Sequence, residues 1–390
     1  MKKTFKTFLI LLLLNSVIFS IVPKYHGARS LSLGYASTAF NFDINMLFLN
    51  PSFLASVTFS MSGYQYQQSY RSYLDFFDKL NETIAFDLEN FDTLTDIDKN
   101  LAWNSIKDLY SNKVGLYGFK SQNPGFIGNG YGISISFENE SVISPVNNDL
   151  LTKDVDEISS QDINSLEVDF LGLSYKKFSI GYAMNFSQDF YIGATLSYLK
   201  GNGNRFQKKL SDNKIFNNDK KIDSYVSNGW ADAQGEFSKI VMDFAANMNI
   251  GQYFRAGVIL KNYGNPVISF NDNEIELKQR IIAGIAFRPS NNLNFFIDMD
   301  IKKAVLIYNG EEMQPISFGI EKGFFKNKFF IRAGLLTDLA SEYFIGSKSH
   351  TLYGLGLGFN MNKIIVDCGM GLDTEGKIKN IAVSGFIIIQ

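Results

Sequence analysis

The chain has 390 residues, a formal net charge of −2 at pH 7 and one cysteine. The near-neutral charge gives no support for nucleic acid as a partner, and a single cysteine excludes an intrachain disulfide framework. Aromatic residues are frequent (36 Phe, 19 Tyr) and prolines are few (7). Aromatic belts at a membrane surface and paired strands that avoid proline both produce such a composition.

The first 20 residues have the layout of a secretory signal peptide. Basic residues 2–3 precede an apolar stretch at 8–14, and Ser20 is suited to the cleavage site. The alternative is a retained anchor helix, but the stretch is short for a membrane span and polar residues 15–16 interrupt it. We therefore expect an exported protein in which residues 1–20 are a signal peptide.

Residues 21–56 show no regular alternation of apolar and polar side chains. Small residues between 34 and 39 would let a short helix pack closely inside a barrel. Pro51 forces Asn50 away from helical angles, where an Asn side chain satisfies nearby backbone groups as Asx turns do. The residues singled out in this segment are Gly27, Ala28, Arg29, Gly34, Asp43, Asn50, Pro51 and Leu54.

This pattern resembles the N-terminal region of the FadL-like long-chain fatty-acid transporters and the PorV/PorQ-type outer-membrane proteins. Those families open with Gly-Ala-Arg and carry an Asn-Pro-Ala-Gly-Leu-Ala-like box before the first strand. This chain departs from them at Ser52 and Phe53, and at Tyr35 where a second Gly is common. The resemblance implies an N-terminal hatch, residues 21–56, that plugs a barrel and opens a route for hydrophobic cargo. The alternative is a periplasmic lead-in that has no plugging role.

From residue 57 to the C-terminus, apolar residues recur at every second position, as in Ile240, Met242 and Phe244 with Lys239 and Asp243 between or beside them. Successive side chains of a strand point to opposite faces, so each segment has one apolar and one polar face. Behind an export signal, this repetition predicts a membrane β-barrel whose outside meets lipid. Strands are expected at 57–68, 112–120, 129–138, 165–187, 189–200, 236–248, 252–262, 276–287, 293–302, 313–322, 327–337, 351–361, 363–371 and 379–390.

The number of strands depends on segment 165–187, which is either one strand with a bulge at Lys176-Lys177 or two strands. Bacterial outer-membrane barrels have an even strand number, short periplasmic turns and longer outer loops. If the segment is one strand, the connections alternate between long and short along the chain, and linker 121–128 is one of the short ones. If it is two strands, the long linker 201–235 falls on the side of the short turns. We therefore predict an all-β chain, a single transmembrane antiparallel β-barrel of about 14 strands over 57–390, with both ends periplasmic. A soluble sandwich or propeller does not predict which connections are long.

The same alternation assigns polar residues to the lumen. Their signs are mixed, which favours a wall of salt bridges over an ion-selective pore, because a selective pore concentrates one sign in a ring. The lumen-facing polar residues singled out are Lys239, Asp243, Arg255, Lys261, Arg280, Asp298, Asp300 and Arg332, with Glu276, Lys278, Lys302, Glu321 and Asp367 in the same rows. Gly354, Gly356 and Gly358 also face inward. They either let something inside the barrel approach the wall or curve the sheet.

The longest linkers differ in character. Linker 69–111 mixes aromatic and acidic residues, and its patches of helical spacing predict short helices that cap the outer mouth. Linkers 139–164, 201–235 and 263–275 are expected to be outer loops, the first two of them mobile. His26 and His350 are the only histidines, and the sequence has no zinc spacing, EF-hand spacing or catalytic triad. We therefore expect no enzyme, no metal and no cofactor.

The leading hypothesis, which rests on the resemblance, is a bacterial outer-membrane transporter or channel for hydrophobic small molecules such as long-chain fatty acids. Cargo would be captured by aromatic outer loops, enter the lumen and leave past a hatch at Asn50-Pro51. The expected partners are membrane lipid and a fatty-acid-like ligand. The alternative is a PorV-like scaffold that binds outer-membrane or secreted proteins, and a third possibility is a general diffusion porin.

Overall fold

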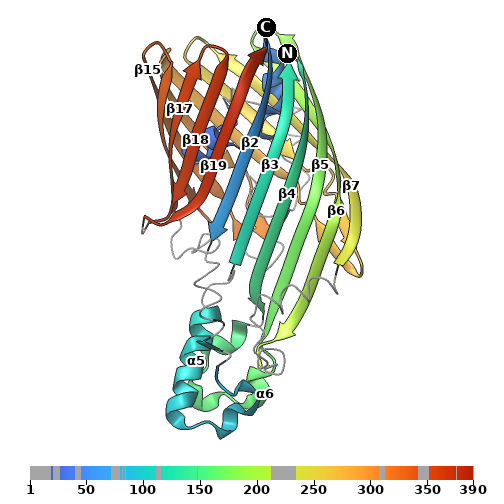
Figure 1. The fold of residues 1–390 in the computed structure, drawn as a ribbon, viewed down its shortest axis with the longest axis vertical. Helices are drawn as coiled ribbons and strands as arrows, with labels where there is room; N and C mark the ends of the chain where they lie inside the picture. The colour runs from blue at the N-terminus through green and yellow to red at the C-terminus, as the bar shows by residue number, and fades with distance from the viewer. Residues whose placement is uncertain are drawn as a thin grey trace.

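The computed structural model describes residues 19–20, 27–39, 45–71, 80, 82–83, 85–110, 116–146, 148–211, 234–306, 312–340, 351–374 and 376–389. Within these residues the chain forms a closed antiparallel barrel of 14 strands (Figure 1). The predicted fold class and strand number are confirmed. In chain order the barrel strands are β2 (Ser60–Arg71), β3 (Leu116–Gly128), β4 (Tyr131–Val146), β5 (Glu167–Ser187), β6 (Phe190–Lys209), β7 (Gln234–Ile250), β8 (Phe254–Lys261), β11 (Arg280–Ser290), β12 (Leu293–Asp300), β15 (Pro315–Phe324), β16 (Phe329–Asp338), β17 (Thr351–Met361), β18 (Ile364–Leu372) and β19 (Ile378–Ile389).

The barrel closes where the last strand meets the first. β19 pairs antiparallel with β2, from Ile389 opposite Ser60 to Asn380 opposite Ser69. The even strand number puts the start of β2 and the end of β19 at the same end of the barrel, which is also the end with the short turns (Figure 1). A shorter sheet joins β1 (Phe19–Ser20), β13 (Ala304–Leu306) and β14 (Glu312–Met313). Most of the expected signal peptide lies outside the described residues, so that interpretation stays a prediction.

Segment 165–187 forms one strand, β5, but the bulge expected at Lys176-Lys177 is wrong. Both lysines stay in register with β6, opposite Lys200 and Leu199, and the register shift lies at Asn185/Ser187 instead. The pair needs no bulge because its side chains alternate. Lys177 points inward, 4.7 Å from the ring centroid of Phe48, whereas Lys176 is exposed on the outer face.

The short linker expected at 121–128 is also wrong, because β3 continues to Gly128. The turn that follows is Asn129-Gly130, with φ of 42° and 91°. An Asn-Gly pair with positive φ at both positions suits the tight turn of a two-residue hairpin. Pro124 has no N–H to donate, and the β3–β4 ladder skips it between Gln122 and Gly125. A proline inside a strand therefore resembled a strand end in the sequence.

The outer face of the wall is apolar. On β7, Ile240, Met242 and Phe244 are exposed, whereas Val241 and Asp243 between them are buried. Such a face suits contact with lipid hydrocarbon. No helix in the described part of the chain is long and apolar enough to cross a membrane.

A helical unit lies beyond the far ends of β5 and β6, away from the short turns (Figure 1). It comprises η2 (Leu88–Thr93), α5 (Asp96–Tyr110), η3 (Asn148–Thr152), η4 (Val155–Glu157) and α6 (Ser160–Ile163). Trp103, Phe91 and Phe170 belong to its buried core. The short helices expected in 69–111 are present, but segment 139–164 is not the loose loop we expected. Its first residues, 139–146, extend β4. Most of the rest packs around α5, because apolar residues such as Ile158 and Ile163 are buried there.

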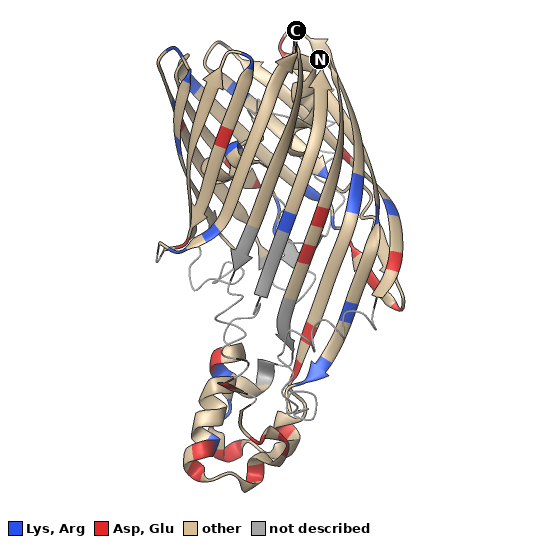
Figure 2. Cartoon of the chain, in the orientation of Figure 1, with Lys and Arg blue, Asp and Glu red and all other residues tan. Residues whose placement is uncertain are grey.

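Local hydrogen bonds hold the acidic surface of this unit together, and Figure 2 shows Asp and Glu gathered over it. Ser159 and Asp162 form a capping box, in which Asp162 Oδ2 accepts from the Ser159 hydroxyl at 2.6 Å and its backbone N–H at 3.0 Å. These bonds, with one from Lys153, lower the pKa of Asp162 to about 2. The Tyr110 hydroxyl donates to the carbonyl oxygen of Glu167 at 2.9 Å, and burial raises the Tyr110 pKa.

Candidate functional site: the N-terminal plug and the lumen

Residues 27–39 and 45–56 lie inside the barrel, and we call them the N-terminal plug. Helix α2 (Ala28–Ser32) contacts β16 to β19, and the 3-10 helix η1 (Pro51–Ser56) contacts β5, β6 and β7. Helix α3 (Met46–Leu49) lies between them in the chain. Every described residue from 27 to 54 is buried. The plug therefore reaches wall segments that are far apart in the barrel.

A buried ion-pair network joins the plug to the wall. Arg29 of α2 donates from Nε and Nη2 to the two carboxylate oxygens of Glu321 on β15, each at 2.9 Å. Arg332 on β16 donates to the same Glu321 at 2.6 Å and to Asp367 on β18 at 2.5 Å. All four side chains are at most 6% exposed. Charge-assisted bonds with two-point geometry are strong and fix orientation, so Glu321 sets the position of α2.

A second wall carboxylate holds the plug by its backbone. Oδ2 of Asp298 on β12 accepts the N–H groups of Ser37 and Thr38, each at 2.7 Å. Two converging N–H groups bind a carboxylate well because both are directed at its charge. Asp298 is one of the residues that alternation assigned to the lumen, but its plug partners could not be read from the sequence.

A small cavity of about 20 Å³ lies beside this contact, with room for about one water molecule. Lys261, Arg280 and Asp300 are among its lining residues. Arg280 pairs with Asp300 through bonds of 2.7 to 2.9 Å, and both side chains are about 5% exposed or less. This arc of the wall thus carries charges of both signs, with Arg280 and Asp300 paired, rather than a ring of one sign.

The other lumen-facing residues have different surroundings. Oδ1 of Asp243 accepts the N–H of Asn262 at 2.8 Å. Lys239 is partly exposed, and the residues two positions before and after it in the same inward row are buried. The guanidinium of Arg255 lies 5.6 Å from the ring centroid of Phe53 in the plug. Among the described residues, no group of three or more His, Cys, Asp or Glu is placed to hold a metal ion.

The Asn50-Pro51 box makes the local bonds that proline favours there. Asn50 has extended angles (φ −161°, ψ 97°), and its Oδ1 accepts the N–H of Ser52 at 3.1 Å and the Ser52 hydroxyl at 2.6 Å. Its Nδ2 donates to the carbonyl oxygen of Thr38 at 2.6 Å. One amide therefore joins the two halves of the plug.

Glycines in the wall let the plug approach closely. A Cβ added at Gly354 would lie 2.3 Å from the Leu31 carbonyl oxygen, and one at Gly356 would lie 1.8 Å from the Ser32 hydroxyl. Any larger residue at either position would overlap the plug. Gly358 differs, because its Cβ would meet Asp367 and Arg332 of the wall. Two of the three inward glycines thus border the plug, and sheet curvature alone does not account for them.

The remaining residues singled out in this segment have varied roles. Gly27 (φ 107°) donates its N–H to Gln67 Oε1 at 3.3 Å, and Gly34 (φ 60°) approaches the wall so closely that a Cβ would lie 2.4 Å from the Leu335 nitrogen. Ala28 and Leu54 are fully buried. Asp43 lies outside the described residues. Movement of this segment as a hatch stays a prediction.

An apolar region lines the lumen on the side of the plug away from the short turns. The expected outer loop 263–275 instead contains a hairpin, β9 (Val267–Phe270) and β10 (Asn273–Glu276), that packs into the barrel. Ile268, Phe270 and Ile275 are at most 2% exposed and cluster with inward-facing wall residues. The cluster also contains Ala28, Leu31, Tyr35, Val142, Leu171, Leu173, Tyr175, Leu199, Phe237, Val241, Leu277, Met313, Leu336, Leu352 and Ala382. Alternating apolar residues on either side of the turn are a sequence signal for this hairpin, which the expectation of an outer loop missed.

These features define a class of fold: an outer-membrane-type β-barrel with an N-terminal segment packed inside its lumen. Among solved structures, the chain is similar to CymD, a monoaromatic hydrocarbon channel, with a TM-score of 0.55 and 12% identity over 95% of this chain and 99% of that one. It is also similar to the Pseudomonas putida toluene transporter TodX, with a TM-score of 0.53 and 9% identity over 94% of this chain and 99% of TodX. The FadL-like resemblance is therefore confirmed at the level of the fold. No protein-family model and no curated protein sequence matches the chain.

Proposed function

We propose that the protein is an outer-membrane channel for hydrophobic small molecules, closed by its N-terminal plug. The observation that carries this proposal is the pairing of an apolar lumen with a plug held by a few specific polar contacts. A molecule that enters the apolar region meets the plug before it reaches the short-turn end of the barrel. Displacement of the plug would open that end.

The chemistry of the lumen supports an apolar cargo. Side chains such as Phe237, Phe270 and Leu199 offer it burial without hydrogen-bonding partners, which suits hydrocarbon. CymD and TodX are described as carrying monoaromatic hydrocarbons and toluene. A long-chain fatty acid, as the FadL-like resemblance implies, is the second cargo to test. We propose no catalytic role for any residue of this chain.

The polar contacts of the plug support a reversible gate. Arg29, Ser37 and Thr38 are held by two wall carboxylates, Glu321 and Asp298, on neighbouring strands. Moving the plug breaks these bonds and exposes its buried apolar side chains, but it leaves the paired strands of the barrel intact. We therefore propose that the plug leaves while the barrel stays closed on itself.

Uptake into vesicles tests this function. Protein reconstituted into phospholipid vesicles should speed entry of radiolabelled toluene or oleate over protein-free vesicles, without steady ion conductance in planar bilayers. Open conductance from the start would instead indicate a diffusion porin. If neither cargo enters faster while proteins are recovered by crosslinking from the helical unit, the scaffold alternative would replace this proposal.

A further inference from the structure

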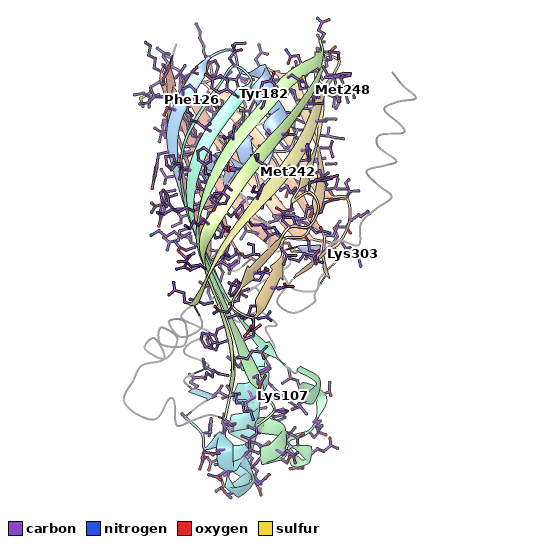
Figure 3. All side chains as sticks on the ribbon, turned by 90° about the vertical axis from the view of Figure 1, so that its right-hand side faces the viewer. Lys107, Phe126, Tyr182, Met242, Met248 and Lys303 are labelled. Carbon is purple, nitrogen blue, oxygen red and sulfur yellow. The ribbon has the colours of Figure 1, made fainter. Side chains whose placement is uncertain are left out.

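The outer wall carries an apolar groove that the channel function does not use. It spans β5, β6, β7, β8 and β11 and has a volume of about 730 Å³, within the range of ~300–1,000 Å³ typical of small-molecule pockets. Its side chains are apolar except for the phenol groups of Tyr182 and Tyr263. Figure 3 views the barrel from this side, with Tyr182 and Met242 labelled on the wall.

Strand register explains why the groove forms here. Tyr182, Ala194, Phe244, Leu260 and Ile281 stand opposite one another on successive strands and form one outward-facing row across the wall. The row mixes large side chains with Ala194, and small residues leave a hollow between large neighbours.

The row nearer the short turns continues this hollow. It is formed by Met184, Ile192, Ala246 and Val258, again in register from strand to strand. Ala246 and Val258 are smaller than Met184, so the hollow extends into this row. The groove therefore runs across the strands rather than along one of them.

One end of the groove is deep. Leu260 and Ile281 are only 7% and 5% exposed, although they belong to the outward-facing row. Tyr263 lies beside them, and its ring meets Phe244 edge-on with centroids 5.2 Å apart. In contrast, Tyr182 at the other end is 62% exposed. The floor of the groove is thus deepest at β8 and β11, although Tyr263 at its rim is 51% exposed.

The wall behind the groove is continuous, so its occupant comes from outside the barrel. Backbone pairing is unbroken from Tyr182 through Ala194, Phe244 and Leu260 to Ile281. Cargo in the lumen has no path through this ladder. The groove lies in the apolar outer face, which borders membrane hydrocarbon.

We propose that this groove binds one acyl chain of a membrane lipid. The lining offers no charged group for a lipid headgroup, so recognition is confined to the hydrocarbon chain. The ring pair of Tyr263 and Phe244 holds the chain at the deep end, and the open end at Tyr182 lets the rest of the lipid remain in the bilayer. The site is independent of cargo transport.

Substitution can fill the groove without touching the plug. Gly193 points inward, where a Cβ would lie 2.6 Å from the carbonyl carbon of Pro51, but its neighbour Ala194 points outward into the groove. Ala194→Trp therefore occupies the groove and leaves the inner face unchanged. Ala246→Trp does the same from another strand. Val383→Trp, on the exposed outer face of β19, is the matched control.

The experiment uses phosphatidylethanolamine vesicles that contain a phospholipid with a photoactivatable diazirine on its acyl chain. In the wild-type protein, labelling should concentrate on peptides with Phe244 and Tyr263. Ala194→Trp and Ala246→Trp should each reduce that labelling about tenfold, equivalent to about 1.4 kcal/mol of binding, and Val383→Trp should not. Labelling that is even around the barrel, or unchanged in both filled variants, would overturn the proposal.

A second arm separates bilayer lipid from cargo. Leu33→Cys with Gly319→Cys, in a Cys368→Ser background, places two Cβ atoms about 3.0 Å apart across the plug and wall. This is slightly below the ~3.5 Å lower limit of disulfide geometry. The Cβ at position 319 would also lie 2.8 Å from the Leu33 carbonyl oxygen, so the plug must shift outward slightly as the bond forms. Labelling should persist in this locked variant. Loss of labelling on locking would mean that the chain arrives through the lumen and would contradict the bilayer source.

Discussion

Arg29 of the plug and Glu321 of β15 are 292 residues apart in sequence and form a two-point ion pair in which both bonds measure 2.9 Å. Glu321 also accepts from Arg332 and from the Asn294 amide, so it joins a plug guanidinium to a wall guanidinium. The closed position of the plug depends on this carboxylate more than on either arginine.

The first prediction tests whether the plug depends more on Glu321 than on Arg29. Glu321→Gln leaves Arg29 and Arg332 buried without the charge between them, and breaking a buried pair in this way costs about 3–5 kcal/mol. Arg29→Met should cost less, because Glu321 keeps Arg332. We expect faster vesicle uptake in the order Glu321→Gln, Arg29→Met, wild type. The control Glu157→Gln, on the exposed part of the helical unit, should match the wild type. Faster uptake by Arg29→Met than by Glu321→Gln would rule out Glu321 as the main anchor.

The wall glycines give a steric prediction. Gly356→Ala places a methyl group 1.8 Å from the Ser32 hydroxyl, so the plug must shift and the channel should leak. Gly385→Ala, whose added Cβ has no neighbour within 4 Å, is the control. Ser32→Gly removes the opposing plug side chain and should restore part of the closure in the double variant, because the added Cβ also lies 2.6 Å from the Cys368 carbonyl oxygen of the wall. Equal uptake by the two alanine variants would show that the plug is not held against β17.

The Asn50 amide gives a prediction about the plug itself. Asn50→Ala leaves the Ser52 N–H and the Thr38 carbonyl without these partners in a buried site, at a cost of about 1–3 kcal/mol each. Asn50→Asp keeps the acceptor for Ser52, but it sets a carboxylate oxygen against the Thr38 carbonyl oxygen, where the wild-type amide donates. Protease cleavage of the plug in folded barrels should therefore rise above the wild type for both variants. Identical cleavage in all three proteins would contradict this role.

The helical unit should respond to acid through Asp162. Its pKa is lowered to about 2 in the folded state, so its stabilising effect is present above the ordinary pKa of 3.8 and is lost as pH falls toward 2. At pH 6, Asp162→Asn should melt the unit at lower denaturant concentration than the wild type. That gap, followed by Trp103 fluorescence in a Trp230→Phe background, should close between about pH 4 and pH 2. A gap that is constant with pH would exclude the carboxylate as its cause.

Most of the barrel could be predicted from the sequence because alternation is a local property. A few consecutive residues, such as those from Ile240 to Phe244, are enough to assign the outer and inner faces of a strand. The errors occurred where two local signals conflicted. The linker expected at 121–128 contains Pro124 and is strand, whereas the turn lies at Asn129-Gly130, inside an expected strand. The hairpin 267–276 falls almost wholly in the expected loop 263–275.

The contacts of the plug could not be predicted in the same way. Alternation places Asp298 and Arg332 in the lumen, but it does not say which plug atoms they face. The bonds from Asp298 to Ser37 and Thr38 bridge about 260 residues, and no local pattern encodes such a pairing. The glycines at 354 and 356 left two readings open, close approach of something inside the barrel or curvature of the sheet, and could not identify α2.

The central claim is that the plug closes a route for hydrophobic cargo, and a reversible lock tests it most directly. Vesicles that contain the Leu33→Cys, Gly319→Cys, Cys368→Ser protein should take up labelled toluene or oleate only after a reductant opens the disulfide. Each single-cysteine variant should transport with or without reductant. Uptake by the oxidised double variant at the wild-type rate would contradict the account.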